Sequence, residues 1–375
     1  MPDMINPVYP RAEMTLSGIS GHKRARKILA GTIASGRISS AYLFTGPDGT
    51  GKKLAAFIFA KAMNCTGGKT SDFGGNFENT VNNQTSESGL PCGKCSSCRK
   101  VDSCVHPDLK VIYPDGNFIK VEAIREINAF LSLSPMEWDR HVLIVGEADK
   151  MNSSAANAFL KTLEEPPPNS VIILVSACEE DLADTIRSRC VRIAFKPIPP
   201  DELAGIASAM GLHVTDTHVR LSLGSVGALL SDRVVNKRDA DLSVFSDMVQ
   251  GKTQVQWKDN EEMESWFNSA IEFLRDMVLL KIDSGSDSGN LDSFSGNLLI
   301  NADRREELSN LCKGTDIKVI IECYERLPVL MNSFVFNVNK KIVINYVQSI
   351  LRSAFSKDAR GRALAQGFPY VGERR

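Results

Sequence analysis

A glycine-rich segment has the residue pattern of a phosphate-binding loop. It reads Gly46-Pro47-Asp48-Gly49-Thr50-Gly51-Lys52-Lys53. In such loops the backbone N–H groups surround nucleotide phosphates, and a lysine, here Lys52, reaches the terminal ones. The next position normally supplies a Ser or Thr hydroxyl to Mg²⁺. Lys53 stands there instead, and its ammonium group cannot ligate a cation. The segment predicts a nucleotide-binding architecture whose candidate contacts are Gly46, Gly49, Gly51, Lys52 and Lys53.

A second nucleotide element is expected after the apolar run 141–145. In ATPases of this type the strand ends in Asp-Glu, where the Asp helps to hold Mg²⁺ and the Glu orients the attacking water. Glu147 is present, but Gly146 replaces the Asp, and Asp149 lies three residues late. Two groups that hold one ion are therefore missing, so we expect weak or absent ATP binding and no efficient hydrolysis. The alternative is a plain core strand with Glu147 solvated at its exit.

Three cysteines follow a metal-binding spacing in Cys92-Gly93-Lys94-Cys95-Ser96-Ser97-Cys98. One tight turn with this spacing directs several sulfurs at one ion, and a closed set of four thiolates is typical of structural zinc. Cys65 is the expected fourth ligand, with Cys104 and His106 as rivals. An iron–sulfur cluster and a set of free thiols are the alternatives. We expect structural Zn²⁺ in a module over 65–98, in which the polar segment 66–90 is a flexible insertion.

Strand and helix patterns alternate around these motifs. Apolar runs predict strands at 39–44, 141–145, 171–175 and 191–195. Helical spacing predicts helices at 52–64, 120–133, 152–163 and 185–188, and the three prolines at 166–168 cannot continue the third. This alternation predicts an α/β fold, a parallel sheet with helices on both faces.

The prolines at 197–200 mark a domain boundary. Short helices are expected over 201–230, in a small lid domain at 198–240, and longer helices at 266–282, 317–331 and 340–355. We therefore expect three domains: a nucleotide-binding-like domain over 1–197, the helical lid, and an all-helical collar domain over 241–375. A Ser/Gly/Asp-rich linker is expected at 284–297 and a loose basic tail at 358–375.

Composition limits the remaining options. The chain has 375 residues, 43% of them hydrophobic and 24% charged, with a net charge of −1. This is an ordinary globular balance, and it argues against autonomous nucleic-acid binding. No apolar run approaches the roughly 20 residues of a membrane helix, and 1–14 has no apolar core of a signal peptide. The expected location is the cytoplasm, with no membrane partner.

The order of these motifs resembles the clamp-loader subunits of bacterial DNA polymerase III, which are AAA+ proteins, over roughly residues 16–230. The matching segments are Ser40-Ala41-Tyr42-Leu43-Phe44, the phosphate loop, Pro91-Cys92-Gly93-Lys94-Cys95, the run Ala155-Ala156-Asn157-Ala158-Phe159-Leu160-Lys161-Thr162-Leu163-Glu164-Glu165-Pro166-Pro167, and Ser188-Arg189-Cys190. The motor subunits of this family, gamma and tau, keep every ATPase element, whereas delta-prime subunits typically lack a working site. Lys53, Gly146 and Gly227, which stands where motors carry an arginine, favour the delta-prime branch.

The resemblance implies a role for Arg189. In this family ATP lies at subunit boundaries, and each ATP site is completed by an arginine from the neighbouring subunit's Ser-Arg-Cys. We expect Arg189 to act on ATP held by a gamma or tau subunit, in a complex that also contains delta and loads the sliding clamp onto primer–template DNA. The alternatives are a gamma/tau-type motor ATPase with unusual metal ligation and a zinc-dependent nucleic-acid-binding module.

Overall fold

The computed structural model describes residues 21–67, 91–231, 233–252, 257–284, 298–333 and 340–355. The expectations for the insertion beyond residue 67, most of the 284–297 linker and the basic tail lie outside these residues. The chain divides into two compact units, one of Met1–His213 with Ser222–Leu230 and one of Val214–Leu221 with Ser231–Arg375.

A five-stranded sheet forms the centre of the first unit. Its order is β2 (Leu109–Ile112), β3 (His141–Val145), β4 (Ser170–Ser176), β1 (Ala41–Thr45) and β5 (Val191–Ala194). Every neighbouring pair is parallel, so the predicted parallel α/β sheet is confirmed. β1, β3 and β4 are buried along their whole length. This explains their unbroken apolar runs, because parallel strands are covered on both faces.

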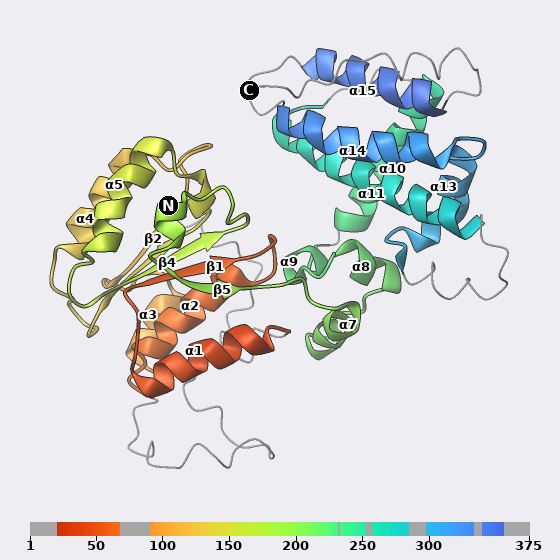
Figure 1. The fold of residues 1–375 in the computed structure, drawn as a ribbon. Coiled ribbons are helices and arrows are strands. Elements are labelled where there is room, and N and C mark those ends of the chain that lie inside the picture. Colours follow the sequence, from red (N-terminus) through yellow and green to blue (C-terminus); the bar gives the residue numbers. More distant parts are fainter. Residues whose placement is uncertain are drawn as a thin grey trace. The chain divides into compact units, whose positions relative to one another are not determined.

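Helices cover both faces of this sheet (Figure 1). One face carries α1 (Lys23–Ser35), α2 (Lys52–Met63) and α3 (Ser96–Asp102), and the other carries α4 (Val121–Leu131) and α5 (Ser153–Glu164). Alternate side chains of β1 enter the two cores: Tyr42 and Phe44 enter the first, Ala41 and Leu43 the second. The sequence patterns had predicted α2, α4 and α5, but not α1, α3 or β2.

Local signals fix the ends of α5. The side chain of Asn152 accepts a hydrogen bond from the Ala155 N–H and caps its start. Its last residue is Glu164, two positions before the first of the three prolines. The chain then returns through β4 to the short α6 (Asp184–Arg187) and to edge strand β5. The helix therefore ends within one residue of the predicted end at residue 163.

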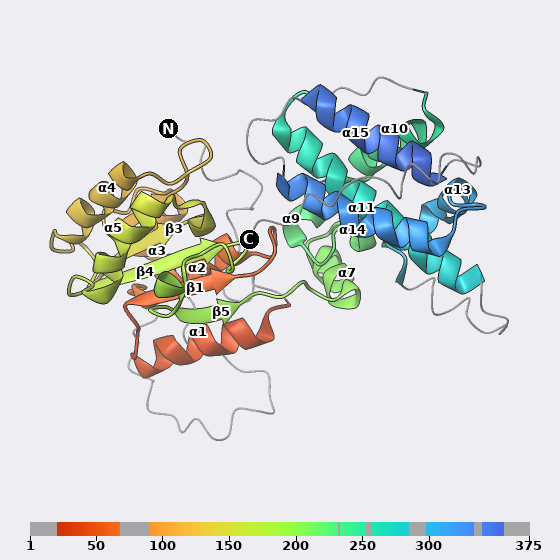
Figure 2. The same cartoon turned by 45° about the horizontal axis from the view of Figure 1, so that its top comes forward.

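Short helices follow the sheet, as expected. α7 (Pro200–Ala209) and α9 (Val226–Leu229) belong to the first unit, whereas α8 (Asp216–Leu221) belongs to the second. The described remainder of the second unit is helical (Figure 2). It contains α10 (Arg233–Gln250), α11 (Asn260–Ser284), η4 (Ala302–Arg304), α13 (Arg305–Leu311), α14 (Ile317–Ser333) and α15 (Lys340–Phe355).

Aromatic side chains dominate the core of the second unit. Trp266, Phe245 and Phe273 are almost completely buried there, among residues of all four long helices. None of the described helices combines the length and the low polarity that a bilayer-spanning helix requires.

Candidate functional site

The phosphate loop connects β1 to α2, as the motif requires. Gly46, Gly49 and Gly51 all have positive φ angles, of 141°, 72° and 90°. A Cβ atom on Gly46 would lie 1.9 Å from the Phe195 carbonyl oxygen, and one on Gly49 would lie 2.0 Å from Ser225 Oγ. Glycine is therefore required at both positions, for backbone conformation and for close approach.

Lys52 is folded back onto its own loop. Its ammonium donates hydrogen bonds to the carbonyl oxygens of Gly46 and Pro47, the latter at 2.7 Å, and lies 3.6 Å from the Asp48 carboxylate. Burial lowers the pKa of Lys52, and the Asp48 carboxylate opposes this shift. A phosphate group arriving at this loop must therefore compete with three oxygen atoms for the lysine.

Lys53 occupies the position of the missing hydroxyl and forms an ion pair. Its Nζ lies 3.3 Å from Glu147 Oε1 and 4.7 Å from the centre of the Tyr113 ring. The second oxygen of Glu147 lies 2.9 Å from Lys150 Nζ. Burial raises the pKa of Glu147, but the hydrogen bond from Lys150 and the charge of Lys53 lower it by more. Glu147 is thus an ionised carboxylate held between two ammonium groups.

Tyr113 fills the space beside Gly146. A Cβ atom on Gly146 would lie 2.4 Å from Tyr113 Cε1 and 2.7 Å from Cδ1. The side chain of a metal-binding Asp at this position would therefore overlap the ring. Tyr113 directly follows β2. The sequence did not single out Tyr113, because its patterns did not show that β2 pairs with β3. Asp149 is engaged elsewhere, since its Oδ1 accepts a hydrogen bond from the Ala177 N–H at 3.2 Å.

The start of α9 packs against the same loop. The Gly227 N–H donates to the Gly49 carbonyl oxygen at 3.1 Å. Ser225 Oγ, which faces Gly49, caps α9 by accepting from the Ala228 N–H. Gly227 therefore meets the loop through its backbone and presents no cation to a bound phosphate.

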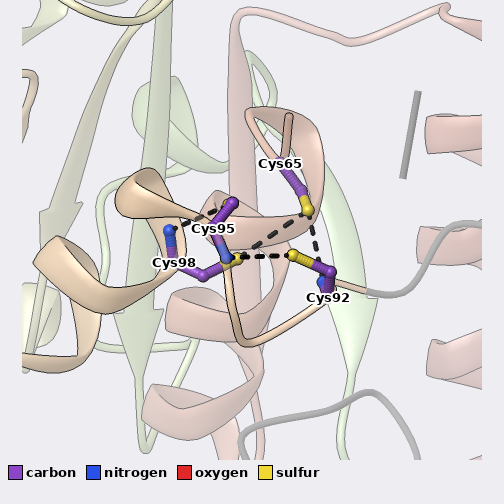
Figure 3. A group of neighbouring side chains, drawn as sticks. All are labelled: Cys65, Cys92, Cys95 and Cys98. Carbon is purple, nitrogen blue, oxygen red and sulfur yellow. Dashed lines mark hydrogen bonds between the residues drawn. The ribbon is translucent and has the colours of Figure 1, made fainter. Parts of the chain in front are cut away.

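Four cysteine side chains converge next to the end of α2 (Figure 3). The sulfurs of Cys65, Cys92, Cys95 and Cys98 all lie within 4.8 Å of one another. Those of Cys65 and Cys98 are 3.8 Å apart, which is about the edge of a tetrahedron with Zn–S bonds of about 2.3 Å. In the described part of the chain this is the one such group of metal-type ligands. The structure thus brings together the four cysteines that the sequence singled out, and their all-sulfur donor set fits zinc.

Backbone N–H groups donate to three of the four sulfurs, whereas burial raises the pKa of the fourth thiol, Cys98. The N–H groups of Cys92, Cys95 and Cys98 donate to the sulfurs of Cys65, Cys92 and Cys95 in turn, at 3.2, 3.3 and 3.4 Å. Burial raises the pKa of Cys95, but the hydrogen bonds from Cys98 N–H and Thr66 outweigh it and bring the pKa to about 5. Gly67 lets the chain pass closely, because a Cβ there would lie 2.6 Å from Cys92 Sγ.

The rival ligands lie outside this cluster. Cys104 is exposed, whereas His106 is buried and stacks on Trp138, with ring centres 3.8 Å apart. Trp138 Nε1 donates to Ser97 Oγ at 2.7 Å, and Ser97 directly precedes Cys98. His106 and Trp138 are therefore packing residues that connect the cysteine cluster to the segment before β3, a link that the sequence pattern did not reveal.

The side chain of Arg189 contacts the last residue of α5 and the short helix α6. Its Nη2 donates to Glu164 Oε1 at 2.6 Å, and its Nη1 donates to the Thr185 carbonyl oxygen at 2.8 Å. Its side chain is 34% exposed. The neighbouring Cys190 packs against the α4–α5 core, and burial raises the pKa of its thiol to about 11. Cys190 is thus a protonated packing residue beside a partly exposed guanidinium.

Comparison with known proteins finds similarity within the first unit. Residues 21–199 match the family model described as DNA polymerase III, delta subunit. The chain is 35% identical to the delta' subunit of Bacillus subtilis DNA polymerase III over 177 residues, which are 47% of this chain and 48% of the relative. It is 31% identical to the tau subunit of the same organism over 222 residues, 59% of this chain and 36% of the relative.

A solved structure also aligns with this chain. It is a DNA polymerase III gamma subunit-related protein from Thermotoga maritima, with a TM-score of 0.39 and 17% identity over 88% of this chain and 99% of that one. The sequence matches span about half or less of the length of the two Bacillus relatives. The predicted resemblance to the clamp-loader subunits of bacterial DNA polymerase III is therefore confirmed, and the family model matches residues 21–199.

Proposed function

We propose that this chain is a delta-prime-like subunit of the DNA polymerase III clamp loader. In this role it hydrolyses no ATP itself and supplies Arg189 to ATP held by a neighbouring gamma or tau subunit. The observation that carries the proposal is the Lys53–Glu147 ion pair above the Tyr113 ring. Lys53 stands at the motif position whose hydroxyl ligates Mg²⁺ in working phosphate-loop ATPases. A magnesium ion at this place would meet a fixed ammonium group and lose both expected protein ligands.

Electrostatics favour this reading over a motor ATPase. Like charges at 4 Å repel by about 4 kcal/mol per unit-charge pair at an effective dielectric constant of 20, and Mg²⁺ carries two charges. The ion would also have to break the contacts of Glu147 with Lys53 and Lys150. Catalysis of phosphoryl transfer depends on that metal to neutralise developing charge.

Arg189 carries the contribution that remains. It is partly exposed, and its backbone is fixed by α6, whose Ile186 is completely buried. An arginine supplied in trans stabilises charge on the transferring phosphoryl group and can be worth ~10³–10⁵ in rate. The alternative is that Arg189 forms only a surface ion pair, which would contribute ~0–1 kcal/mol to stability.

The other parts of the chain take supporting roles in this proposal. α7 to α9 are the lid, and the four cysteines hold one structural Zn²⁺. Because α10 (Arg233–Gln250) runs across residue 240, the collar through which subunits assemble begins with that helix. The partners are gamma or tau and delta, with the sliding clamp and primer–template DNA bound through the complex in the cytoplasm.

The test is a loader reconstituted from this chain with its gamma or tau and delta partners. Arg189→Ala is expected to reduce DNA-stimulated ATPase activity and clamp loading by at least tenfold. Arg192→Ala is the matched control, because Arg192 is also exposed and paired, with Glu179 at 2.5 Å. Equal activities of the two variants would refute the role of Arg189.

The competing function is a motor ATPase with unusual metal ligation, favoured only by the intact loop glycines and Lys52. It predicts magnesium-dependent turnover by the isolated chain that Lys52→Ala abolishes. Our proposal predicts none.

A further inference from the structure

Glu164 holds the guanidinium of Arg189 within this chain. The carboxylate belongs to the last residue of α5, and the arginine follows α6. The Nη2–Oε1 distance of 2.6 Å is that of a strong charge-assisted hydrogen bond. The Thr185 carbonyl oxygen and Ser188 Oγ accept from Nη1 at 2.8 and 3.4 Å. The arginine is thus directed toward its own subunit by one charged and two neutral acceptors.

A nucleotide phosphate and Glu164 compete for the same donors. Both are anions that accept from the arginine fork, and a phosphate carries more charge and more acceptor atoms. Arg189 can turn toward a partner without unfolding, because only its side chain has to move while buried Ile186 keeps α6 in place. Glu164 is half exposed, at 50%, so water solvates its carboxylate once the arginine leaves.

We propose that Glu164 is a positioning residue that competes with the neighbour's ATP for Arg189. This competition lowers the affinity of the neighbouring subunit for ATP. The proposal rests on the trans role of Arg189 proposed above. An exposed ion pair contributes up to ~1 kcal/mol, and 1.4 kcal/mol is a factor of ten. Removing the carboxylate charge is therefore expected to tighten ATP binding by about two- to fivefold.

The experiment titrates ATP against the reconstituted loader containing Glu164→Gln. Half-saturating ATP is expected to fall two- to fivefold, while maximal turnover stays within about twofold of the wild type. The difference is expected to shrink with added salt, because the pair is partly exposed. Glu165→Gln is the matched control: Glu165 is the exposed next residue, and its variant is expected to leave half-saturation unchanged.

Failure of this proposal is distinguishable from failure of the trans role. If Arg189→Ala abolishes stimulated turnover while Glu164→Gln leaves half-saturation unchanged or weakens it, the competition is refuted and the trans role stands. If Arg189→Ala has no effect, the trans role fails and this proposal fails with it.

A second measurement on the isolated full chain tests the restraint itself. Phenylglyoxal modifies free guanidinium groups, and the rate at Arg189 can be followed by peptide mass spectrometry. Glu164→Gln is expected to raise this rate at least twofold, with Glu165→Gln at the wild-type rate. Equal rates in all three proteins would show that Glu164 does not restrain Arg189.

Discussion

In the proposed function, Lys53, Gly146 and Tyr113 are three residues from separate elements that together exclude one ion. The ammonium group of Lys53 replaces the charge of the cation, and the Tyr113 ring takes the space that an aspartate at position 146 would need. The lysine and the ring also contact each other, because Lys53 Nζ lies 4.7 Å from the centre of the Tyr113 ring. Restoring a single residue is therefore not expected to restore a magnesium site.

The contact between Gly146 and Tyr113 gives a stability prediction. Gly146→Ala is expected to destabilise the protein by about 1–3 kcal/mol, because the new methyl group would lie 2.4 Å from the ring. In urea unfolding, a double-mutant cycle with Tyr113→Ala should recover 0.5 kcal/mol or more as coupling energy. Gly31→Ala in α1 is the control, because nothing lies within 4 Å of its added Cβ. A neutral Gly146→Ala variant would contradict this packing.

His22 gives a pH prediction at the same loop. It is buried, its Nε2 donates to the Thr50 carbonyl oxygen at 2.7 Å, and burial lowers its pKa although that hydrogen bond raises it in part. The unfolded chain therefore binds the proton more readily. The stability that neutral His22 provides is complete above the unfolded pKa of about 6.5 and declines as the pH falls toward the lower folded pKa.

Unfolding by urea at pH 7.5 and at pH 5.5 checks this prediction. The wild type is expected to lose more stability on acidification than His22→Gln, by less than about 1.4 kcal/mol per pH unit, the limit for one proton. His213→Gln, a change at an exposed histidine, is expected to keep the wild-type pH slope. Identical slopes for wild type and His22→Gln would contradict the prediction.

At the scale of elements, the cysteine cluster fixes a short segment that has little core of its own. α3 has only seven residues, too few to be stable as an isolated helix in water. Its position depends on Cys95 and Cys98 at its start and on the Trp138–Ser97 hydrogen bond. Loss of the metal is therefore expected to reach Trp138 and the segment before β3.

Metal removal tests this dependence. Elemental analysis is expected to find one zinc per chain in the wild type and in Cys104→Ser, and none in Cys65→Ser. A strong chelator should lower the urea midpoint, expose 91–102 to protease and change Trp138 fluorescence. Trp138→Phe identifies that signal among the three tryptophans. Zinc retained by Cys65→Ser but lost from Cys104→Ser would overturn the ligand assignment.

At the scale of the whole molecule, the chain has no charge excess with which to bind DNA alone. Its net charge is −1, and non-specific DNA affinity comes from neutralised phosphates. The isolated chain is expected to bind primer–template DNA with a Kd of ~10⁻⁶ M or weaker at physiological salt, because ~10⁻⁶ M is the tightest typical Kd of non-specific binding. A gel shift at two salt concentrations measures this. Nanomolar, weakly salt-dependent binding would favour the zinc-dependent nucleic-acid module instead.

The sequence determined the features that depend on local order. Apolar runs and helical spacing predicted the parallel sheet and most of its helices, because periodicity follows from burial. The spacing of Cys92, Cys95 and Cys98 fixed three ligands of the cluster, since a tight turn sets their separation. Glycines at 46, 49 and 51 marked the loop, because only glycine tolerates those backbone angles and contacts.

Only the tertiary structure decided which distant residues meet. It placed Cys65 rather than Cys104 or His106 with the other sulfurs, brought Tyr113 to Gly146 and Lys53 to Glu147, and joined Arg189 to Glu164. These contacts depend on the order of the strands in the sheet and on how the helices pack across it. Neither produces a periodic pattern in a single sequence. The same motif residues therefore specified a phosphate-loop architecture, while long-range packing brought Glu147 and the Tyr113 ring to Lys53.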